Sequence, residues 1–441
     1  MSVDLTSPEP TNVTGPRMIL RPRQLIARLK ADPIIRNSAI YLTGSVLAGM
    51  LGYVFHFETG HLLGPSQYSV VASAIAALYL LMVPVVGLQF VSARFTSVAV
   101  AKGQSGSVIP MLLRLSTISI LAALPVAAVL ILLAPVVASF LNLPDRKVVY
   151  LLALAALCAI LVTVNRGALQ GMRRFVALSA NMLTEMATRL ALAAALIATG
   201  FGAFGALATL SAGAVVAYGQ SFLMLRSARA SFAKSEKMEG LGSYAVLATI
   251  ASIGINYIFS VDTLLAKHFL SSGAAGVYAA ASVLARVVYF LGLSVAGVIF
   301  PEIAALHARN EAHYHVVDLG LLMVGAMGIA LIIAYSLFPG LVLLPYGPSF
   351  SPARGYLGVF AVALTLLALS NLLINYFLSI ARRLFALPLF GACILETVLI
   401  AIFHSSIWQI LTMVVISLGL LAASMGAIYI IDRLSVRRQV A

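Results

Sequence analysis

The chain has 441 residues, of which 61% are hydrophobic and only 10% are charged, and its mean hydropathy is +1.04. About a quarter of the residues of a soluble domain are charged, so this composition excludes a soluble protein and indicates a polytopic membrane protein. The formal net charge of +14 does not imply a nucleic-acid partner, because the basic residues gather at the ends of apolar runs, where topology and anionic lipid account for them.

A membrane span needs about 20 mostly apolar residues, and by this rule the sequence predicts about twelve spans. In chain order the predicted spans cover 38–57, 67–91, 108–140, 148–168, 175–199, 203–226, 243–265, 275–300, 316–340, 355–380, 384–403 and 407–431. The connections between them are short. We therefore expect an all-α membrane protein without an extramembrane domain.

Two repeated strings divide the chain into similar halves. HLLGPSQYSV at His61 matches HFLSSGAAGVYAA at His268, and RRFVAL at Arg173 matches RRLFAL at Arg382, with nearly the same separation in both pairs. Internal repeats of this kind are typical of transporters. The expected organisation is a basic cytoplasmic tail (1–36), an N-terminal six-helix bundle (37–228), a cytoplasmic linker (229–240), a C-terminal six-helix bundle (241–432) and a second cytoplasmic tail (433–441).

The distribution of Lys and Arg predicts that both termini lie in the cytoplasm. One side of the predicted spans carries the basic N-terminal tail, the linker and the C-terminal tail, whereas the opposite side carries only Arg146, Lys147, Lys267 and Arg354. Short cytoplasmic segments are enriched in basic residues. We therefore expect a multi-pass protein of the cell inner membrane.

No catalytic motif is present: the sequence lacks GxSxG, HExxH, a Walker sequence and any Cys/His cluster with metal spacing. The two cysteines, Cys158 and Cys393, lie in different halves and support neither a disulfide nor a metal site. His307, His313 and His315 are interpreted as part of a solvated loop. We expect no enzyme, no cofactor and no metal.

Ionisable residues inside the predicted spans are the candidates for function, since a charge in hydrocarbon is costly and normally faces a partner or a wet cavity. Arg286 has no acidic residue within helical reach on its own span, so it must find Asp262, Glu185 or Glu396 across the bundle, or a ligand. Glu185 and Arg189 are four residues apart and can pair along one helix face. A substrate-facing role and a structural ion pair both remain open for Arg286.

Four stretches carry a resemblance to a known family. They are LGPSQYSV after the first span, NRGALQGMRRFVAL closing the fourth, VDTLLAKHFLSSGAAGVYAAASVLAR across spans seven and eight, and YGPSFSPARGYL before the tenth. With these stretches the chain, from about Asn37 to Asp432, resembles the polysaccharide-export branch of the multidrug/oligosaccharidyl-lipid/polysaccharide (MOP) flippase superfamily. The resemblance implies two six-helix bundles in a V around a central cavity, and movement of lipid-linked oligosaccharides between leaflets.

The resemblance also directs the choice of site residues. The related lipid II flippases are thought to hold a pyrophosphate with cavity arginines, and Arg286 lies on the corresponding eighth span, about one turn from the matching position. The first span, 38–57, contains no arginine, which makes an O-antigen, capsule or exopolysaccharide unit a better candidate than a peptidoglycan precursor. The candidate substrate-binding residues are Arg286, Arg189, Arg114, Asn181 and Asn256. The candidates for ion coupling or structural pairing are Asp262, Glu185 and Glu396.

The function predicted from the sequence is a flippase that moves a polyprenyl-pyrophosphate-linked oligosaccharide by alternating access. Guanidinium groups suit such a substrate because they donate paired hydrogen bonds to phosphate oxygens. The expected partners are the lipid-linked oligosaccharide and membrane lipids, with a polysaccharide polymerase or glycosyltransferases as candidate protein partners. The alternative is a cation-coupled multidrug exporter of the same superfamily. A membrane enzyme such as a polymerase is disfavoured by the small outer loops.

Overall fold

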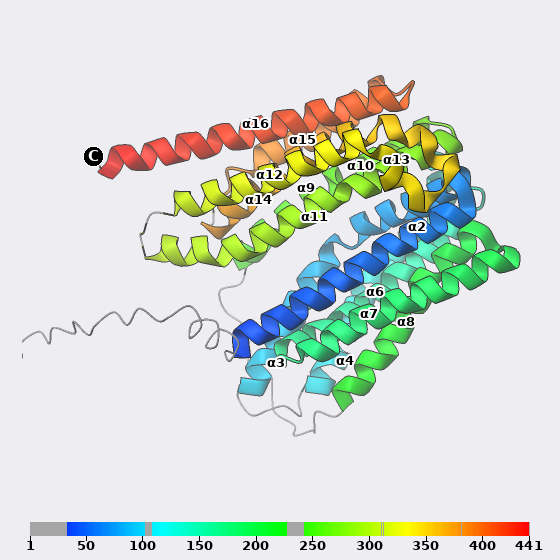
Figure 1. The fold of residues 1–441 in the computed structure, drawn as a ribbon. Coiled ribbons are helices and arrows are strands. Elements are labelled where there is room, and N and C mark those ends of the chain that lie inside the picture. Colours follow the sequence, from blue (N-terminus) through cyan, green and yellow to red (C-terminus); the bar gives the residue numbers. More distant parts are fainter. Residues whose placement is uncertain are drawn as a thin grey trace, which may run out of the picture.

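The computed structural model describes residues 33–101, 108–226, 242–309, 311, 313–380 and 382–440, and the secondary structure of these residues is entirely helical (Figure 1). In the first half the helices are α2 (Pro33–Leu81), α3 (Val83–Ala101), α4 (Val108–Leu132), α5 (Ala134–Phe140), α6 (Lys147–Gly171), α7 (Phe175–Leu196), the π-helical turn η2 (Ile197–Phe201) and α8 (Gly202–Arg226).

The helices of the second half follow a similar order. They are α9 (Gly242–Ile258), α10 (Val261–Phe269), α11 (Ser272–Ala308), α12 (Tyr314–Leu337), α13 (Pro339–Leu343), the 3₁₀ turns η3 (Leu344–Tyr346) and η4 (Pro348–Gly355), α14 (Leu357–Ser379), α15 (Ala386–Ile402) and α16 (Ile407–Val440). Every predicted span corresponds to one of these helical segments or to two consecutive ones. The described residues include nine helical stretches that are long and apolar enough to cross a membrane by themselves.

Several predicted spans are broken in the structure. Gly64 has φ 68° and ψ 173°, which divides α2 into two arms at a conformation that glycine adopts without strain. The third predicted span is divided at Leu133, just before Pro135, which has no backbone N–H to continue the helix. The seventh is divided at Phe259–Ser260, and its outer part extends to Phe269, beyond the predicted end at residue 265. These breaks free backbone groups inside the membrane that neighbouring side chains can bind.

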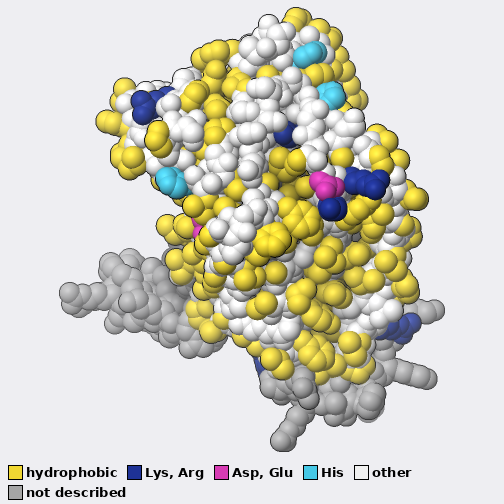
Figure 2. Space-filling model, turned by 90° about the vertical axis from the view of Figure 1, so that its right-hand side faces the viewer, with side chains coloured by type: hydrophobic (Ala, Val, Ile, Leu, Met, Phe, Trp, Pro, Cys, Tyr) yellow, Lys and Arg dark blue, Asp and Glu magenta, His cyan; other side chains and the backbone are white. Residues whose placement is uncertain are grey.

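The two halves form two bundles that lie side by side and diverge toward one end (Figure 1). We call this the terminal end, because α2 begins there and α16 ends there, and the opposite end the distal end. α2 makes most of the contacts of the first half with the second, chiefly to α11 and α10. Figure 2 views the distal end, where hydrophobic and uncharged atoms cover most of the surface and few ionic side chains are visible.

The distal junction between the halves is closely packed. Gly276 of α11 lies against the backbone carbonyl of Pro65, and a Cβ at this position would overlap that oxygen. Gly60 lies in the same way against the ring of Tyr346, whose hydroxyl is 3.0 Å from the hydroxyl of Tyr68. The absence of side chains at the two glycines therefore sets how closely the halves approach.

We predict that Gly276→Ala weakens the distal junction and lowers the free energy of unfolding by about 1–3 kcal/mol, as overpacking of a dense interface does. The matched control is Gly273→Ala, since a Cβ at Gly273 meets nothing within 4 Å. Thermal unfolding of both purified variants in the same detergent measures the difference. Equal midpoints for the two variants would contradict the close approach at Gly276.

Candidate functional site

The first half contains a buried ionic cluster built by α6, α7 and α8. The carboxylate of Glu185 accepts hydrogen bonds from Arg166, at 2.6 Å, and from Arg189. Asn181 accepts from Arg166 Nε at 2.8 Å and donates to the carbonyl of Ala217 at 2.7 Å. The pairing of Glu185 with Arg189 that their spacing predicted is confirmed, whereas the contribution of Arg166 from the neighbouring helix was not predicted.

This cluster carries excess positive charge, because one carboxylate faces two guanidinium groups. The side chain of Glu185 is 6% exposed, and those of Arg166 and Arg189 are 17% and 19% exposed. Arg189 Nε has no hydrogen-bond partner among the described residues. Both carboxylate oxygens of Glu185 are thus bound inside the cluster, while Arg189 retains an N–H group that can donate to a ligand.

Arg286 of α11 lies beside the break between α9 and α10, which divides the seventh predicted span of the chain. Arg286 is 6% exposed and donates to the carbonyl of Phe259 at 2.9 Å and to Thr263 Oγ1 at 3.4 Å. Its guanidinium carbon lies 4.3 Å from the centre of the Phe259 ring, a cation–π contact. The break between α9 and α10 leaves the Phe259 carbonyl outside both helices, and Arg286 binds it. The side chain is therefore held by neutral groups.

No carboxylate among the described residues forms an ion pair with Arg286. Asp262 accepts from Tyr278 at 3.0 Å and from Thr263 Oγ1 at 3.2 Å, so the Thr263 hydroxyl that Arg286 binds lies between the guanidinium and this carboxylate. The Phe259 ring that Arg286 contacts also packs against the ring of Tyr79 of α2 in the opposite half, with ring centroids 6.0 Å apart. The guanidinium thus lies at the junction of the halves, where Arg286 Nε and the Tyr53 hydroxyl both lack a hydrogen-bond partner among the described residues.

Glu396 on α15 is the most isolated ionisable side chain of the site. It is 0% exposed, and neither carboxylate oxygen has a hydrogen-bond partner in the described part of the chain. α15 contacts α10, the helix that carries Asp262. A buried carboxyl group without a partner is costly when ionised, so Glu396 is suited to hold a proton or to bind a cation.

Two predicted residues lie apart from both clusters. Arg114 is exposed on α4, and in the described residues it contacts none of the other predicted site residues. Asn256 donates to the carbonyl of Ser252 in its own helix at 2.9 Å. The structure therefore brings Arg189, Asn181 and Glu185 together in one half and Arg286 and Asp262 together in the other.

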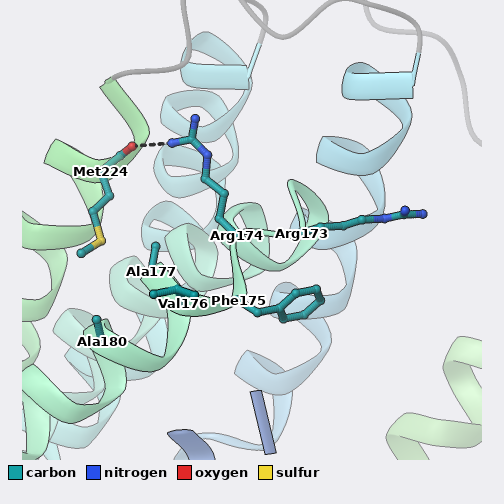
Figure 3. A pocket seen from close by; sticks show the side chains of 7 residues that line it. All are labelled: Arg173, Arg174, Phe175, Val176, Ala177, Ala180 and Met224. Carbon is teal, nitrogen blue, oxygen red and sulfur yellow. Dashed lines mark hydrogen bonds between the residues drawn. The ribbon is translucent and has the colours of Figure 1, made fainter. Parts of the chain in front are cut away.

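A shallow apolar pocket of about 440 Å³ lies at the terminal end between α7 and α8 (Figure 3). Arg174 donates to the carbonyl of Met224 at 2.9 Å, while the side chain of Arg173 points to the other side of the helix end. In the second half Arg382, which matches Arg173, pairs with Asp432, and this carboxylate also accepts from Tyr376 at 2.8 Å. The pocket contains none of the predicted site residues.

At the terminal end of the second half, the expectation that His313 lies in a solvated loop is wrong. His313 is buried rather than solvated, because its ring stacks on Tyr314 and its Nε2 lies 3.4 Å from the hydroxyl of Tyr376. Burial lowers the pKa of His313, so this side chain favours the neutral form. In the described residues no group of three or more His, Cys, Asp and Glu side chains could hold a metal ion.

The fold is that of a multi-pass membrane protein built from two helical bundles. The structure is similar to the inward-facing conformation of a multidrug resistance MATE family transporter of the MOP superfamily, with a TM-score of 0.70, 13% identity, and coverage of 88% of this chain and 96% of that chain. The outward-facing conformation of such a transporter gives a TM-score of 0.65 at 13% identity, covering 94% and 98%.

A third similar structure is a MOP superfamily transporter from Pyrococcus furiosus, described as having a binding pocket of reverse polarity that suggests a different function. Its TM-score is 0.62 at 14% identity, with coverage of 92% of this chain and 95% of that chain. The comparison with curated proteins gives no match. The model of the polysaccharide biosynthesis protein family matches residues 34–307, more than half of the chain, and the chain belongs to this family.

We predict that Glu185→Ala destabilises the protein by about 3–5 kcal/mol, because it leaves two buried guanidinium groups without their carboxylate. Arg189→Ala should cost less, since Glu185 keeps its bond to Arg166. The amount of protein in the membrane and the thermal unfolding midpoint measure both effects. A larger loss for Arg189→Ala than for Glu185→Ala would contradict the arrangement.

Proposed function

We propose that this protein is a flippase for a polyprenyl-diphosphate-linked oligosaccharide. The observation that carries the proposal is the guanidinium of Arg286, which is buried at the junction of the halves, is bound only by neutral groups and retains a free Nε. A diphosphate supplies the negative charge that such a group lacks and accepts paired hydrogen bonds from it. The family model, described as that of polysaccharide biosynthesis proteins, supports an oligosaccharide as the other part of the substrate.

The charge balance of the first half supports the same substrate class. Arg166 and Arg189 share the single carboxylate of Glu185, so this cluster is also net positive. The net positive cluster of the first half favours an anionic head group over a cationic drug. The solved transporter with a binding pocket of reverse polarity is an example of the same fold in which pocket charge is linked to a different function.

In the proposed cycle the head group enters at the terminal end and leaves at the distal end, while the polyprenyl chain stays in the bilayer. The proposed location is the cell inner membrane with both termini in the cytoplasm, in keeping with the basic residues of the tails and linker. The higher similarity to the inward-facing structure supports a conformation open toward the terminal end. The proposed partners are glycosyltransferases, which would supply the lipid-linked unit, and a polymerase, which would use it.

The alternative function is a cation-coupled multidrug exporter, and the observation that favours it is Glu396 together with Asp262. Neither oxygen of Glu396 is bound by another described group, and its helix contacts the helix that carries Asp262. Proton or cation binding at this pair would energise either kind of transporter. We therefore assign Glu396 to energy coupling in the flippase. A net positive charge around the site arginines favours the flippase over the drug exporter.

We predict that Arg286→Ala lowers transport of a fluorescent polyprenyl-diphosphate-linked sugar in proteoliposomes by at least about tenfold, because charge-assisted hydrogen bonds are worth about 1.5–3 kcal/mol. Arg286→Lys should retain part of the rate, since lysine keeps the charge and loses the two-pronged geometry. Arg146→Ala, which alters an exposed arginine, is the matched control.

The amount of each variant in the membrane is measured in the same preparations. The Phe259 carbonyl loses its partner in Arg286→Ala, but no carboxylate loses an ion pair, so the protein level should stay close to that of the unaltered protein. Normal transport by Arg286→Ala, or a loss of transport in proportion to a loss of protein, would overturn the substrate-binding role.

We predict that Glu396→Gln removes the response of transport to an imposed proton or sodium gradient while leaving substrate binding within about twofold. The amide keeps the shape of the side chain and cannot exchange a proton. Glu311→Gln, at an exposed carboxylate, serves as the control. A full gradient response in Glu396→Gln would exclude this residue from coupling.

A further inference from the structure

Lys267 is a buried cation that the proposed site does not use. It lies near the end of α10 at the distal junction and is 1% exposed. Its Nζ donates to Ser69 Oγ at 2.9 Å and to Ser272 Oγ at 3.3 Å. Ser69 belongs to the first half and Ser272 to the second. The ammonium group therefore bridges the two halves.

The bridge contains no opposite charge. No carboxylate among the described residues forms an ion pair with Lys267, and the hydroxyl of Ser69 gives its own proton to the carbonyl of Ser66 at 2.6 Å. Two neutral hydroxyl oxygens thus bind a positive group that burial has removed from water, an arrangement that costs free energy as long as the junction is closed. Buried lysines are normally paired.

Lys267 and the residue that Arg286 binds lie on the same helix, α10. Arg286 binds Thr263, which lies on the same helix four residues before Lys267. One helical turn rises by about 5.4 Å, so Lys267 lies about one turn beyond the Arg286 contact toward the distal end. The two cations form a series along the junction of the halves.

We propose that Lys267 is an anion anchor on the exit side, covered by Ser69 in this conformation and uncovered when the halves separate at the distal end. The inference rests on the proposed function and adds a residue to it: the diphosphate passes from Arg286 to Lys267 before release. Separation breaks one hydrogen bond to a neutral hydroxyl, and the freed ammonium then binds phosphate oxygens.

The neutral partner is what suits Lys267 to this role. Separating the two members of a buried salt bridge leaves two uncompensated charges, whereas separating a lysine from a serine hydroxyl breaks only a hydrogen bond to a neutral group. A lysine held by serine can therefore be released in each cycle at lower cost than a lysine held by a carboxylate. The competing interpretation is a purely structural donor that never meets the substrate.

Labelling of the native lysines tests the exposure. A membrane-impermeant amine reagent is applied to the distal side, and modification of Lys267 is compared with that of Lys147, whose side chain is 68% exposed. Asn142, five residues before Lys147, donates to the carbonyl of His268 at 2.9 Å, so both lysines lie near the distal end. We expect Lys267 to react at least about tenfold more slowly, since its amine is buried, and to react faster in Gly276→Ala.

Short-chain polyprenyl diphosphate should then slow the labelling of Lys267 in Gly276→Ala and leave Lys147 unchanged, whereas the matching polyprenol should protect neither. Protection by inorganic pyrophosphate would also support the anchor and would assign recognition to the phosphates alone. No increase of labelling in Gly276→Ala, or no protection by the diphosphate, would overturn the proposal.

Transport measurements separate this inference from the proposed function. Lys267→Met should lower turnover at least about tenfold and leave polyprenyl diphosphate binding from the terminal side within about twofold, because the charge acts after entry. Lys267→Arg should restore part of the turnover, and Lys147→Met should have no effect. Full turnover in Lys267→Met with loss of binding in Arg286→Ala would reject the exit anchor alone. Normal binding and transport in Arg286→Ala would reject the flippase site itself.

Discussion

The cost of placing charge in hydrocarbon is the constraint on which the rest of this structure depends. Glu185 binds two arginines in the first half, and the carbonyl of Phe259 binds Arg286 in the second. In the first half one carboxylate faces two guanidinium groups, so that cluster retains positive charge. The breaks in the helices serve this arrangement, since they expose backbone oxygens that neutral binding of a cation requires.

The two halves follow the same order of helices but treat their charges differently. In the second half Arg382 pairs with Asp432, whereas in the matching Arg173–Arg174 turn of the first half Arg174 binds a backbone carbonyl. Glu396 and Asp262 likewise lie only in the second half. A chain built from two similar units has thus specialised them: of the four buried acidic residues in the described part of the chain, three lie in the second half.

Hydropathy and spacing predicted the helices and the Glu185–Arg189 pair, because both depend on residues close in sequence. The sequence could not place Arg166 in that cluster, since its partner comes from a different helix. Lys267 was assigned to a segment outside the membrane because the predicted span ended at residue 265. The structure continues the helix to Phe269 and covers Lys267 with Ser69 from the opposite half. The burial of an ionisable group is therefore decided by tertiary packing that hydropathy does not report.

The close contact of Gly276 with Pro65 has a consequence for how the environment acts on this protein. Every ion pair among the described residues lies within one half, while the contacts across the distal junction are hydroxyl groups, aromatic rings, glycine backbone and the Lys267 ammonium bound by neutral hydroxyls. Salt screens charges over about 8–10 Å and has little hold on such contacts. Hydrostatic pressure and bilayer lateral tension act on packing volume instead, so we expect the closure of this end to respond to them more than to salt.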